Sequence, residues 1–361
     1  MNIRIPGPTP IPPAVKEALA VEIPGHRSRP FAQLLAEVTA LVKPAFGAAG
    51  DVLVLTGSGT GGLEAGVANL LSPGQPALFA SIGTFGERWA KIAAAFGAEV
   101  VRLDFPPGQV AEPAAVADAL RADPRLAVLF LTHSETSTGA LNDLPAIVAA
   151  ARAVRPDLVV AVDGVSSAGA VPLETDAWGL DLVITASQKA LMGPPGLALV
   201  AVGPRGWEAI EAARMPRYYW DLRRARQDAA KNQTPFTPAV QDLLGLRAGL
   251  RLLQAEGLPA SFARHRRLGQ LARQGLRELG FTPLAAEDQA SPTVTAAWLP
   301  EGMSGSALLQ RLAARDVYLS AGHAKDRTLR VAHMGYCAES DVACALSVLA
   351  EEAAALRGGG A

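Results

Sequence analysis

Lys189 and Asp163 are the residues of this chain whose types and positions point most directly to chemistry. Each follows an apolar run, DLVVAVDG for the aspartate and LVITASQK for the lysine, so each charge is expected in apolar surroundings. Desolvation lowers the pKa of a lysine and frees its amine for Schiff-base chemistry, whereas a buried carboxylate is costly without a cationic partner or several donors. A buried Asp–Lys ion pair, or a lysine that extends outward to solvent, stays open as an alternative.

A glycine-rich loop, TGSGTGG at 56–62, combines hydroxyl groups with exposed amides at the start of a predicted helix. Such a helix N-terminus binds anions, and phosphate is the natural ligand. Gly57, Gly59 and Gly62 also fit the dinucleotide fingerprint G-x-G-x-x-G, and a plain tight turn would use the same glycines. The fingerprint requires an acidic residue at the end of the next strand, but this chain has ASIG there, at 80–83.

These residues must be positioned by elements that are far apart in the chain. Short apolar runs, typical of strands buried on both faces, occur at 51–56, 76–81, 100–105, 126–132, 158–164, 182–187 and 197–203. Amphipathic helix candidates fill most intervals, at 61–71, 84–96, 112–122 and 143–155, which predicts an α/β fold with a doubly wound, mainly parallel sheet. Only QKALMGPPG separates the last two runs, so those strands are predicted to be antiparallel neighbours. Ligands of such a sheet sit beyond the carboxyl ends of its strands.

The pattern changes in the last third of the chain. The stretch 205–240 is rich in Arg, Pro and aromatic residues with weak periodicity, and long helical patterns follow at 240–256 and 260–279. After Pro283, the segments SPTVTAAWL, VYLSAG and TLRVAH and helix candidates at 304–315 and 339–356 form an α+β pattern. We predict an N-terminal segment at 1–20, a large domain at 21–257 and a small C-terminal domain at 258–361.

The composition favours a small-molecule ligand. Lys and Arg number 33 against 34 Asp and Glu, so there is no electrostatic footprint for nucleic acid or an anionic membrane. No run approaches the roughly 18 apolar residues of a membrane span, and a cytoplasmic location is expected. The five histidines are scattered, and Cys337 and Cys344, interpreted as packing residues, lack metal-ligand spacing, so we expect no metal.

Two motifs, VDGVSS at 162–167 and TASQKALMGPPG at 185–196, resemble the cofactor core of class V aminotransferases, in the alanine–glyoxylate and serine–pyruvate aminotransferase branch. Further motifs match in order along nearly the whole chain: PGPTPIPP at 6–13, GHRS at 25–28, TGSGTGGLEA at 56–65, HSETSTG at 133–139, NQTPFTPAV at 232–240 and TLRVAHMGY at 328–336. The resemblance implies the fold type I architecture of pyridoxal-phosphate enzymes. That architecture has a large domain with a seven-stranded, mainly parallel sheet and a small α+β C-terminal domain, assembled as a homodimer with shared active sites.

The resemblance also implies roles for individual residues. Lys189 would carry pyridoxal 5′-phosphate as a Schiff base, and Asp163 would keep the pyridine nitrogen protonated so that the ring can act as an electron sink. The residues that would hold the cofactor phosphate are Ser58, Gly59, Thr60 and Gln188.

Four other residues are implied to contact the cofactor or the substrate. Thr136 would hydrogen-bond the ring hydroxyl, and Phe85 would stack on the ring unless it is a core aromatic residue. Arg330 would bind the substrate carboxylate through its planar fork, with a plain surface arginine as the alternative. Thr234 would reach the phosphate of the neighbouring subunit, or would instead cap a helix that begins near Pro238.

These roles imply ping-pong transamination between a small amino acid, alanine or serine, and a small 2-oxo acid, glyoxylate or pyruvate. Cysteine desulfurases share the fold but normally have His before the lysine and a reactive loop Cys, whereas this chain has Gln188 and has its two cysteines near the terminal helix. Phosphoserine and aminoethylphosphonate transamination stay open within the fold. A nicotinamide-dependent dehydrogenase built on the 57–62 glycines and a catalytically silent scaffold are the alternatives from other classes.

Overall fold

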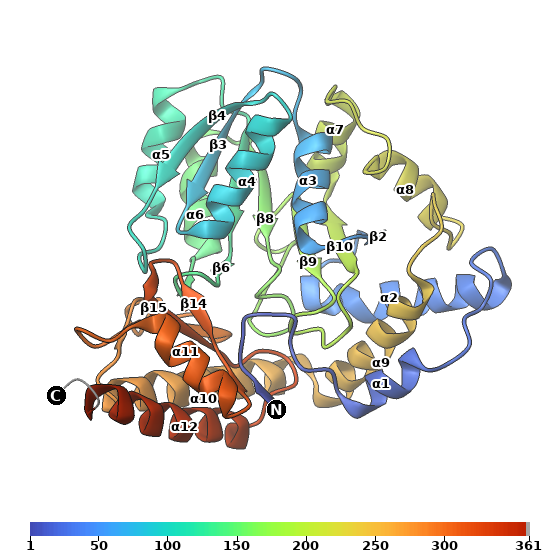
Figure 1. Ribbon diagram of the computed structural model, residues 1–361. Helices are drawn as coiled ribbons and strands as arrows, with labels where there is room; N and C mark the ends of the chain where they lie inside the picture. The colour runs from blue at the N-terminus through green and yellow to red at the C-terminus, as the bar shows by residue number, and fades with distance from the viewer. Residues whose placement is uncertain (359–361) are drawn as a thin grey trace.

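The structure is a computed structural model that describes residues 1–358 (Figure 1). Its larger part contains a seven-stranded sheet with the strand order β2 (Asp51–Thr56), β10 (Leu197–Val202), β9 (Leu182–Ala186), β8 (Val159–Asp163), β5 (Val128–Thr132), β3 (Pro76–Ser81) and β4 (Glu99–Asp104). β10 runs antiparallel to β2 and β9, and the other neighbours pair in parallel. The predicted mixed sheet and its antiparallel pair are confirmed. Strands β9, β8 and β5 are buried at every position, which is why they appear as continuous apolar runs.

Helices cover both faces of this sheet, because alternate residues of each strand bury apolar side chains on opposite sides. One face packs against α3 (Gly59–Leu70), α4 (Thr84–Ala95), α7 (Pro204–Ala212) and α8 (Leu222–Ala229). The other face packs against α2 (Arg29–Phe46), α5 (Pro113–Ala122), α6 (Leu144–Val154) and α9 (Val240–Glu256). The doubly wound arrangement predicted from the alternation of runs is therefore confirmed.

The stretch 205–240 holds α7 and α8, for which the sequence predicts no helix. α8 is mostly charged and buries only Leu222 and Ala225, so it contains too few apolar residues for a helix to be predicted from them. Its first turn is stabilised by Asp221, whose side chain accepts a hydrogen bond from the Arg223 amide at 3.0 Å. Capping and packing against the sheet form this helix where hydrophobic pattern alone does not.

The C-terminal part is a four-stranded antiparallel sheet with three helices. Its strand order is β11 (Thr282–Pro283), β12 (Val294–Trp298), β15 (Lys325–Ala332) and β14 (Ser320–Gly322). Its helices are α10 (Leu258–Glu278), α11 (Gly305–Ala314) and α12 (Glu339–Gly358). The predicted α+β pattern is confirmed. Cys337 is buried just before α12, but Cys344 is exposed, so the interpretation of Cys344 as a packing residue is wrong.

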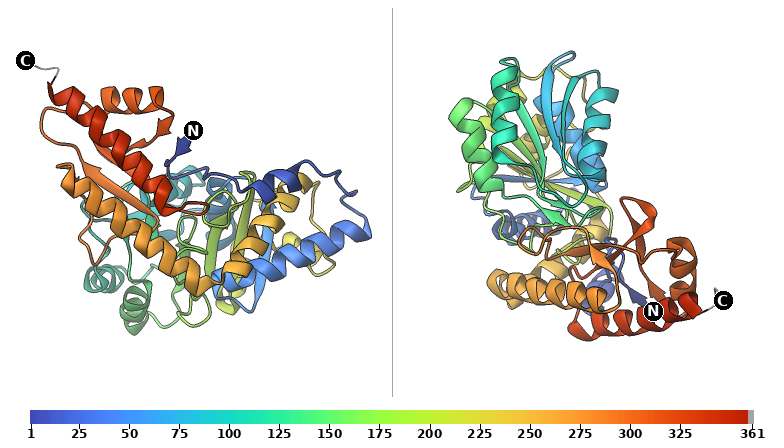
Figure 2. Two further views of the ribbon diagram at one scale, coloured as in Figure 1. Left: turned by 90° about the horizontal axis from the view of Figure 1, so that it is seen from below. Right: turned by 90° about the vertical axis from the view of Figure 1, so that its left-hand side faces the viewer.

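The chain start joins the C-terminal part, because β1 (Asn2–Ile3) pairs in parallel with β13 (Val317–Tyr318) (Figure 2). α1 (Pro13–Leu19) then packs on α9 of the larger part. A two-stranded sheet of β6 (Ser134–Glu135) and β7 (Ala140–Leu141) follows β5. The domain boundary at 257/258 stays a prediction; it falls at Gly257, between α9 and α10, and residues 359–361 of the proposed small domain lie outside the described residues.

Every helix within residues 1–358 is too short or too polar to cross a lipid bilayer.

Candidate active site

The N-terminus of α3 lies at the carboxyl end of β2 and presents the loop residues predicted to hold phosphate. Ser58 is the N-cap residue, and its hydroxyl accepts a hydrogen bond from the Gly61 amide at 3.3 Å. The amides of the first turn have no partner within the helix and lie at the positive end of its dipole. Gly59 lies close to Val165, since an added Cβ would be 3.1 Å from that side chain. The anion-binding end of α3 is therefore beside the loop after β8.

The three glycines of the possible dinucleotide fingerprint have close-packing partners. A Cβ at Gly57 would lie 2.7 Å from the Trp220 ring, and one at Gly62 would lie 2.7 Å from the Ile184 side chain. Together with the contact between Gly59 and Val165, these distances show that a neighbouring element leaves little room for a side chain at each of the three positions. The glycine spacing therefore has a packing cause and gives no independent support to nicotinamide binding.

Asp163 is the last residue of β8 and Lys189 follows the neighbouring parallel strand β9, which places both at one edge of the sheet. Asp163 is 4% exposed, and its carboxylate accepts a hydrogen bond from the Val165 amide at 2.9 Å. Burial raises the pKa of Asp163 to about 7, against the opposing effects of the Val165 amide and the charges of Lys189 and Arg88.

Lys189 is 9% exposed, which does not fit the alternative of a lysine extended to solvent. Within residues 1–358 its amine makes no ion pair with Asp163, and it donates a hydrogen bond to the Pro6 carbonyl instead. Burial lowers the pKa of Lys189 to about 8, and the nearby charge of Asp163 opposes that shift. This shift favours the neutral amine, the form that acts as a nucleophile or a proton acceptor.

Among the buried side-chain atoms that have no hydrogen-bond partner within the described residues are Thr136 Oγ1 and Gln188 Oε1. Buried polar atoms in folded proteins are nearly always paired, so such atoms call for a polar ligand or water. Thr136 belongs to the loop after β6, and Gln188 precedes Lys189. A polar ligand beside Lys189 would give both atoms a hydrogen-bond partner.

Phe85 lies in the first turn of α4, and it is partly exposed and belongs to none of the hydrophobic clusters among the described residues. The alternative of a core aromatic residue is therefore not supported. Arg88, one turn later, places its guanidinium 4.6 Å from the Phe85 ring centre and donates to the Thr60 hydroxyl at 3.2 Å. Arg88 was not predicted from the sequence, although its position three residues after Phe85 puts it on the same helix face.

Glu135, also not predicted, is fully buried and joins the Thr136 loop to α4. Its carboxylate accepts hydrogen bonds from the Phe85 amide at 2.9 Å and the Ser137 amide at 2.9 Å. Burial raises the pKa of Glu135 while these amides oppose the shift, and the positive end of α4 favours a negative charge there. The sequence feature that could have indicated Glu135 is its position directly before Thr136 in the HSETSTG motif.

Arg330 reaches this region from β15 of the C-terminal part. Its Nε donates to the Ala321 carbonyl at 2.7 Å and its Nη1 to the Thr136 carbonyl at 3.3 Å. Arg330 is partly buried and its contact with Thr136 joins the two parts of the molecule, so it is not a plain surface arginine. It can bind a carboxylate through its remaining N–H groups.

Thr234 is not brought to these residues within one chain. Its hydroxyl donates to the Phe236 carbonyl at 2.8 Å, and its own carbonyl accepts from Arg27 at 2.7 Å. The alternative that Thr234 caps the helix near Pro238 is wrong, because α9 begins after Ala239 without a side-chain capping hydrogen bond.

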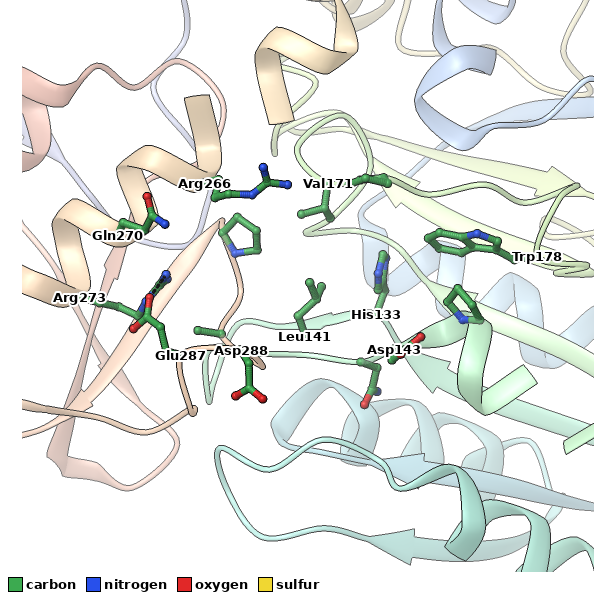
Figure 3. A pocket seen from close by; sticks show the side chains of 15 residues that line it. His133, Leu141, Asp143, Val171, Trp178, Arg266, Gln270, Arg273, Glu287 and Asp288 are labelled. Carbon is green, nitrogen blue, oxygen red and sulfur yellow. Dashed lines mark hydrogen bonds and ion pairs between the residues drawn. The ribbon is translucent and has the colours of Figure 1, made fainter. Parts of the chain in front are cut away.

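A separate cavity of about 510 Å³ lies between the two parts, and Figure 3 shows the side chains that line it. His133 and Trp178 line it from the larger part, and Arg273 lines it from α10. Arg273 is paired with Glu287 at 2.6 Å, and burial lowers the pKa of His133 to about 3. No residue of the predicted site lines this cavity, so we do not assign it to the site.

The sequence was compared with known proteins. It is 42% identical over 353 residues to a protein of Synechococcus sp. (strain PCC 6716) named "Soluble hydrogenase, small subunit", covering 96% of this chain and 91% of that protein. It is 34% identical over 362 residues to the L-aspartate–glyoxylate aminotransferase of Paracoccus denitrificans (strain Pd 1222), covering 97% and 91%.

A solved structure, the alanine–glyoxylate aminotransferase of Nostoc sp., superposes with a TM-score of 0.93 at 28% identity, covering 97% of this chain and 94% of that one. The fold implied by the sequence resemblance is thereby confirmed. Residues 16–342 match the family described as "Aminotransferase class-V". The chain therefore belongs to the class V aminotransferases, which are pyridoxal-phosphate-dependent transaminases.

Proposed function

We propose that this enzyme transfers an amino group from alanine or serine to a small 2-oxo acid, glyoxylate or pyruvate, by a ping-pong route. The observation that carries the proposal is the pair of buried residues Asp163 and Lys189 at the ends of adjacent strands. The names of the Paracoccus and Nostoc relatives both contain glyoxylate, which supports glyoxylate as the acceptor. The name of the Synechococcus relative, a soluble hydrogenase subunit, applies to that protein. For this chain, the Asp163–Lys189 pair favours transamination.

Lys189 and Asp163 would have different roles in the same reaction. Lys189 Nζ would hold the cofactor covalently, leave when the substrate amine takes its place, and then move a proton between the substrate Cα and the cofactor C4′. Asp163 would hold a proton on the pyridine nitrogen by its negative charge. When bound, pyridoxal phosphate supplies the electron sink for the charge left at Cα.

The remaining residues would bind and orient. The cofactor phosphate would be held by the α3 N-terminus with Ser58, Gly59, Thr60 and Gln188, and the ring by Phe85 and Thr136. The partnerless hydroxyl oxygen of Thr136, which can donate a hydrogen bond, supports the place of Thr136 beside the ring. Arg330 would bind the substrate carboxylate, and its hydrogen bond to the Thr136 carbonyl supports a position beside the ring.

A panel of amino donors with glyoxylate and pyruvate tests the proposed substrates. We expect the highest kcat/KM with alanine or serine as donor and glyoxylate as acceptor. Arg330→Lys keeps the charge but loses the bidentate fork, so it should lower kcat/KM for every α-amino acid by roughly tenfold or more.

Arg327→Lys, at an exposed position of the same strand, is the matched control and should change little. If Arg330→Lys lost as much activity with amines that lack a carboxylate as with α-amino acids, Arg330 would have a structural role and would not bind the substrate carboxylate. A clear preference for aspartate over alanine and serine would refute the proposed donors.

We also propose a homodimer whose active sites are shared, with Thr234 reaching the phosphate of the neighbouring subunit. Apolar side chains near Thr234 are exposed, including Tyr218 at 73% and Tyr219 at 44%. Tyr219 stacks on Phe236, two residues after Thr234, with ring centres 4.9 Å apart. Clustered exposed aromatic rings of this kind are typical of protein interfaces and support the proposal.

Mixed dimers of Lys189→Ala and Thr234→Ala subunits test the shared site. Each mixed dimer would carry both lesions in one site and leave the other intact, so up to about half of the wild-type activity should return. Thr234→Ser, which keeps the hydroxyl, should stay active as the control. No recovery in verified mixed dimers, with each parent inactive alone, would refute sharing through Thr234.

A further inference from the structure

Residues 2–9, here called the N-terminal strap, connect the strand that carries Arg330 with the loop that carries Lys189. At one end, the Arg4 amide donates to the Tyr318 carbonyl at 2.8 Å, and the Ala332 amide of β15 donates to the Arg4 carbonyl at 2.7 Å. Ala332 lies two residues beyond Arg330 on the same strand. The strap is therefore fixed to the C-terminal sheet close to the proposed carboxylate-binding residue.

At its other end, the strap is fixed to the backbone around Lys189. The Thr9 amide donates to the Gln188 carbonyl at 3.0 Å, and the Thr9 hydroxyl donates to the Lys189 carbonyl at 3.1 Å. Thr9 is 5% exposed, so these hydrogen bonds are sheltered from water. Two anchored ends leave the intervening residues, 5–8, little freedom to move away from the lysine.

Between its anchors, the strap contacts the Lys189 amine itself. The carbonyl of Pro6, a buried residue, accepts a hydrogen bond from Lys189 Nζ. Gly7 follows with a φ of +138°, and a Cβ there would lie 2.7 Å from Nζ and 3.0 Å from Cε of Lys189. Only glycine combines this backbone conformation with the space that the lysine side chain occupies.

We propose that the strap is a positioning element for Lys189, in which the Pro6 carbonyl orients the amine and Gly7 leaves room for it. This inference rests on the proposed role of Lys189 as proton carrier. A neutral amine has two N–H groups and one lone pair, so donation of one N–H to Pro6 restricts where the lone pair points. When the lone pair takes a proton from the substrate, the resulting ammonium would keep that acceptor, and release of the same proton would restore the neutral amine. Lys189 thus returns to its starting state.

Gly7→Ala tests the proposal because its methyl group would displace the lysine amine from Pro6. The first measurement uses cofactor-free protein: trace labelling with acetic anhydride across a pH series, with acetylation of Lys189 read by peptide mass spectrometry. Only the neutral amine reacts, so the wild-type profile should rise with pH and reach half of its maximum near pH 8, the value to which burial lowers the lysine pKa. A hydrogen-bond acceptor favours the charged form, so its loss should move the midpoint lower by about one pH unit.

The second measurement is turnover by the holoenzyme with ordinary and Cα-deuterated alanine. Gly7→Ala should lower kcat by roughly tenfold to a hundredfold, change KM little and raise the deuterium isotope effect on kcat, because misplacement of the amine slows proton transfer. A defect in folding or cofactor retention would not raise the isotope effect.

Two further variants separate the contact from backbone strain. Gly97→Ala also places a side chain at a positive φ, +81°, but its added Cβ meets nothing within 4 Å, so its labelling midpoint and its turnover should match those of the wild type. Thr9→Val removes one anchor without adding bulk beside the amine, and it should move the labelling midpoint in the same direction by less. If Gly7→Ala does not fold, Thr9→Val decides the matter.

An unchanged midpoint in both Gly7→Ala and Thr9→Val, or an equal effect in Gly97→Ala, would overturn the proposal. Labelling of the free amine needs no transamination. The two proposals can therefore fail separately. If borohydride reduction places the cofactor on another lysine while Gly7→Ala still shifts the labelling midpoint of Lys189, the proposed function is refuted and the contact between the strap and Lys189 is supported.

Discussion

Lys189→Ala is expected to lower kcat by about four orders of magnitude or more while the fold stays intact. One side chain would provide both the covalent attachment of the cofactor and the proton carrier, so its loss removes two contributions together. The phosphate contacts of the α3 N-terminus do not involve Lys189, and weakened but measurable cofactor binding should remain. Turnover under saturating cofactor, together with the thermal midpoint of unfolding, measures both parts of this expectation.

The attachment itself is read by borohydride reduction of the holoenzyme and peptide mapping. The reduced cofactor should be found on Lys189, which is 9% exposed. Lys91→Ala is the matched control, because that side chain is 76% exposed and pairs only with Glu87 on the surface of α4. A reduced adduct on another lysine, or turnover that survives Lys189→Ala, would overturn the assignment.

Asp163→Asn is expected to lower kcat by at least about a hundredfold, the low end of what one charge contact supplies to a transition state. Asparagine keeps the shape of the side chain and can still accept from the Val165 amide, which Asp163 contacts at 2.9 Å. The variant loses only the negative charge that would keep the pyridine nitrogen protonated. Single-turnover kinetics with alanine should locate the defect in the chemical step.

The pH dependence of cofactor affinity provides a second test of Asp163. Burial raises its pKa to about 7, so the carboxylate gains a proton as the pH falls through that value. Wild-type affinity should therefore weaken below about pH 7, and the Asn variant, which cannot titrate, should lack this dependence. Cofactor binding followed by protein fluorescence between pH 5.5 and 8.5 covers the window.

Asp181→Asn is the control for removal of a buried carboxylate. Asp181 is also 4% exposed, but it pairs with Arg152 at 2.8 Å away from the proposed site. Its replacement should lower the free energy of unfolding and leave kcat per folded molecule unchanged. Near-normal kcat in Asp163→Asn, or an equal loss in Asp181→Asn, would refute the catalytic role of Asp163.

The local patterns of the sequence were enough to predict the large sheet and the positions of its two most reactive residues. Buried parallel strands must be apolar along their whole length, so β8 and β9 were evident as runs, and Asp163 and Lys189 stood out at their ends. The short connection between β9 and β10 left no room for a crossover helix and fixed their antiparallel pairing. These features follow from local periodicity and chain length, which a single sequence contains.

The tertiary structure alone decided which distant groups surround those residues. Nothing in the pattern around Pro6 indicates that its carbonyl meets Lys189, or that Glu135 accepts from the first turn of α4. The contact between Arg330 and the Thr136 carbonyl likewise depends on how the C-terminal sheet packs against the larger part. Hydrophobic periodicity repeats within one element and carries no information about its partner. Contacts between elements are set by side-chain packing and by the need to pair buried polar groups, and both act only once the chain has folded.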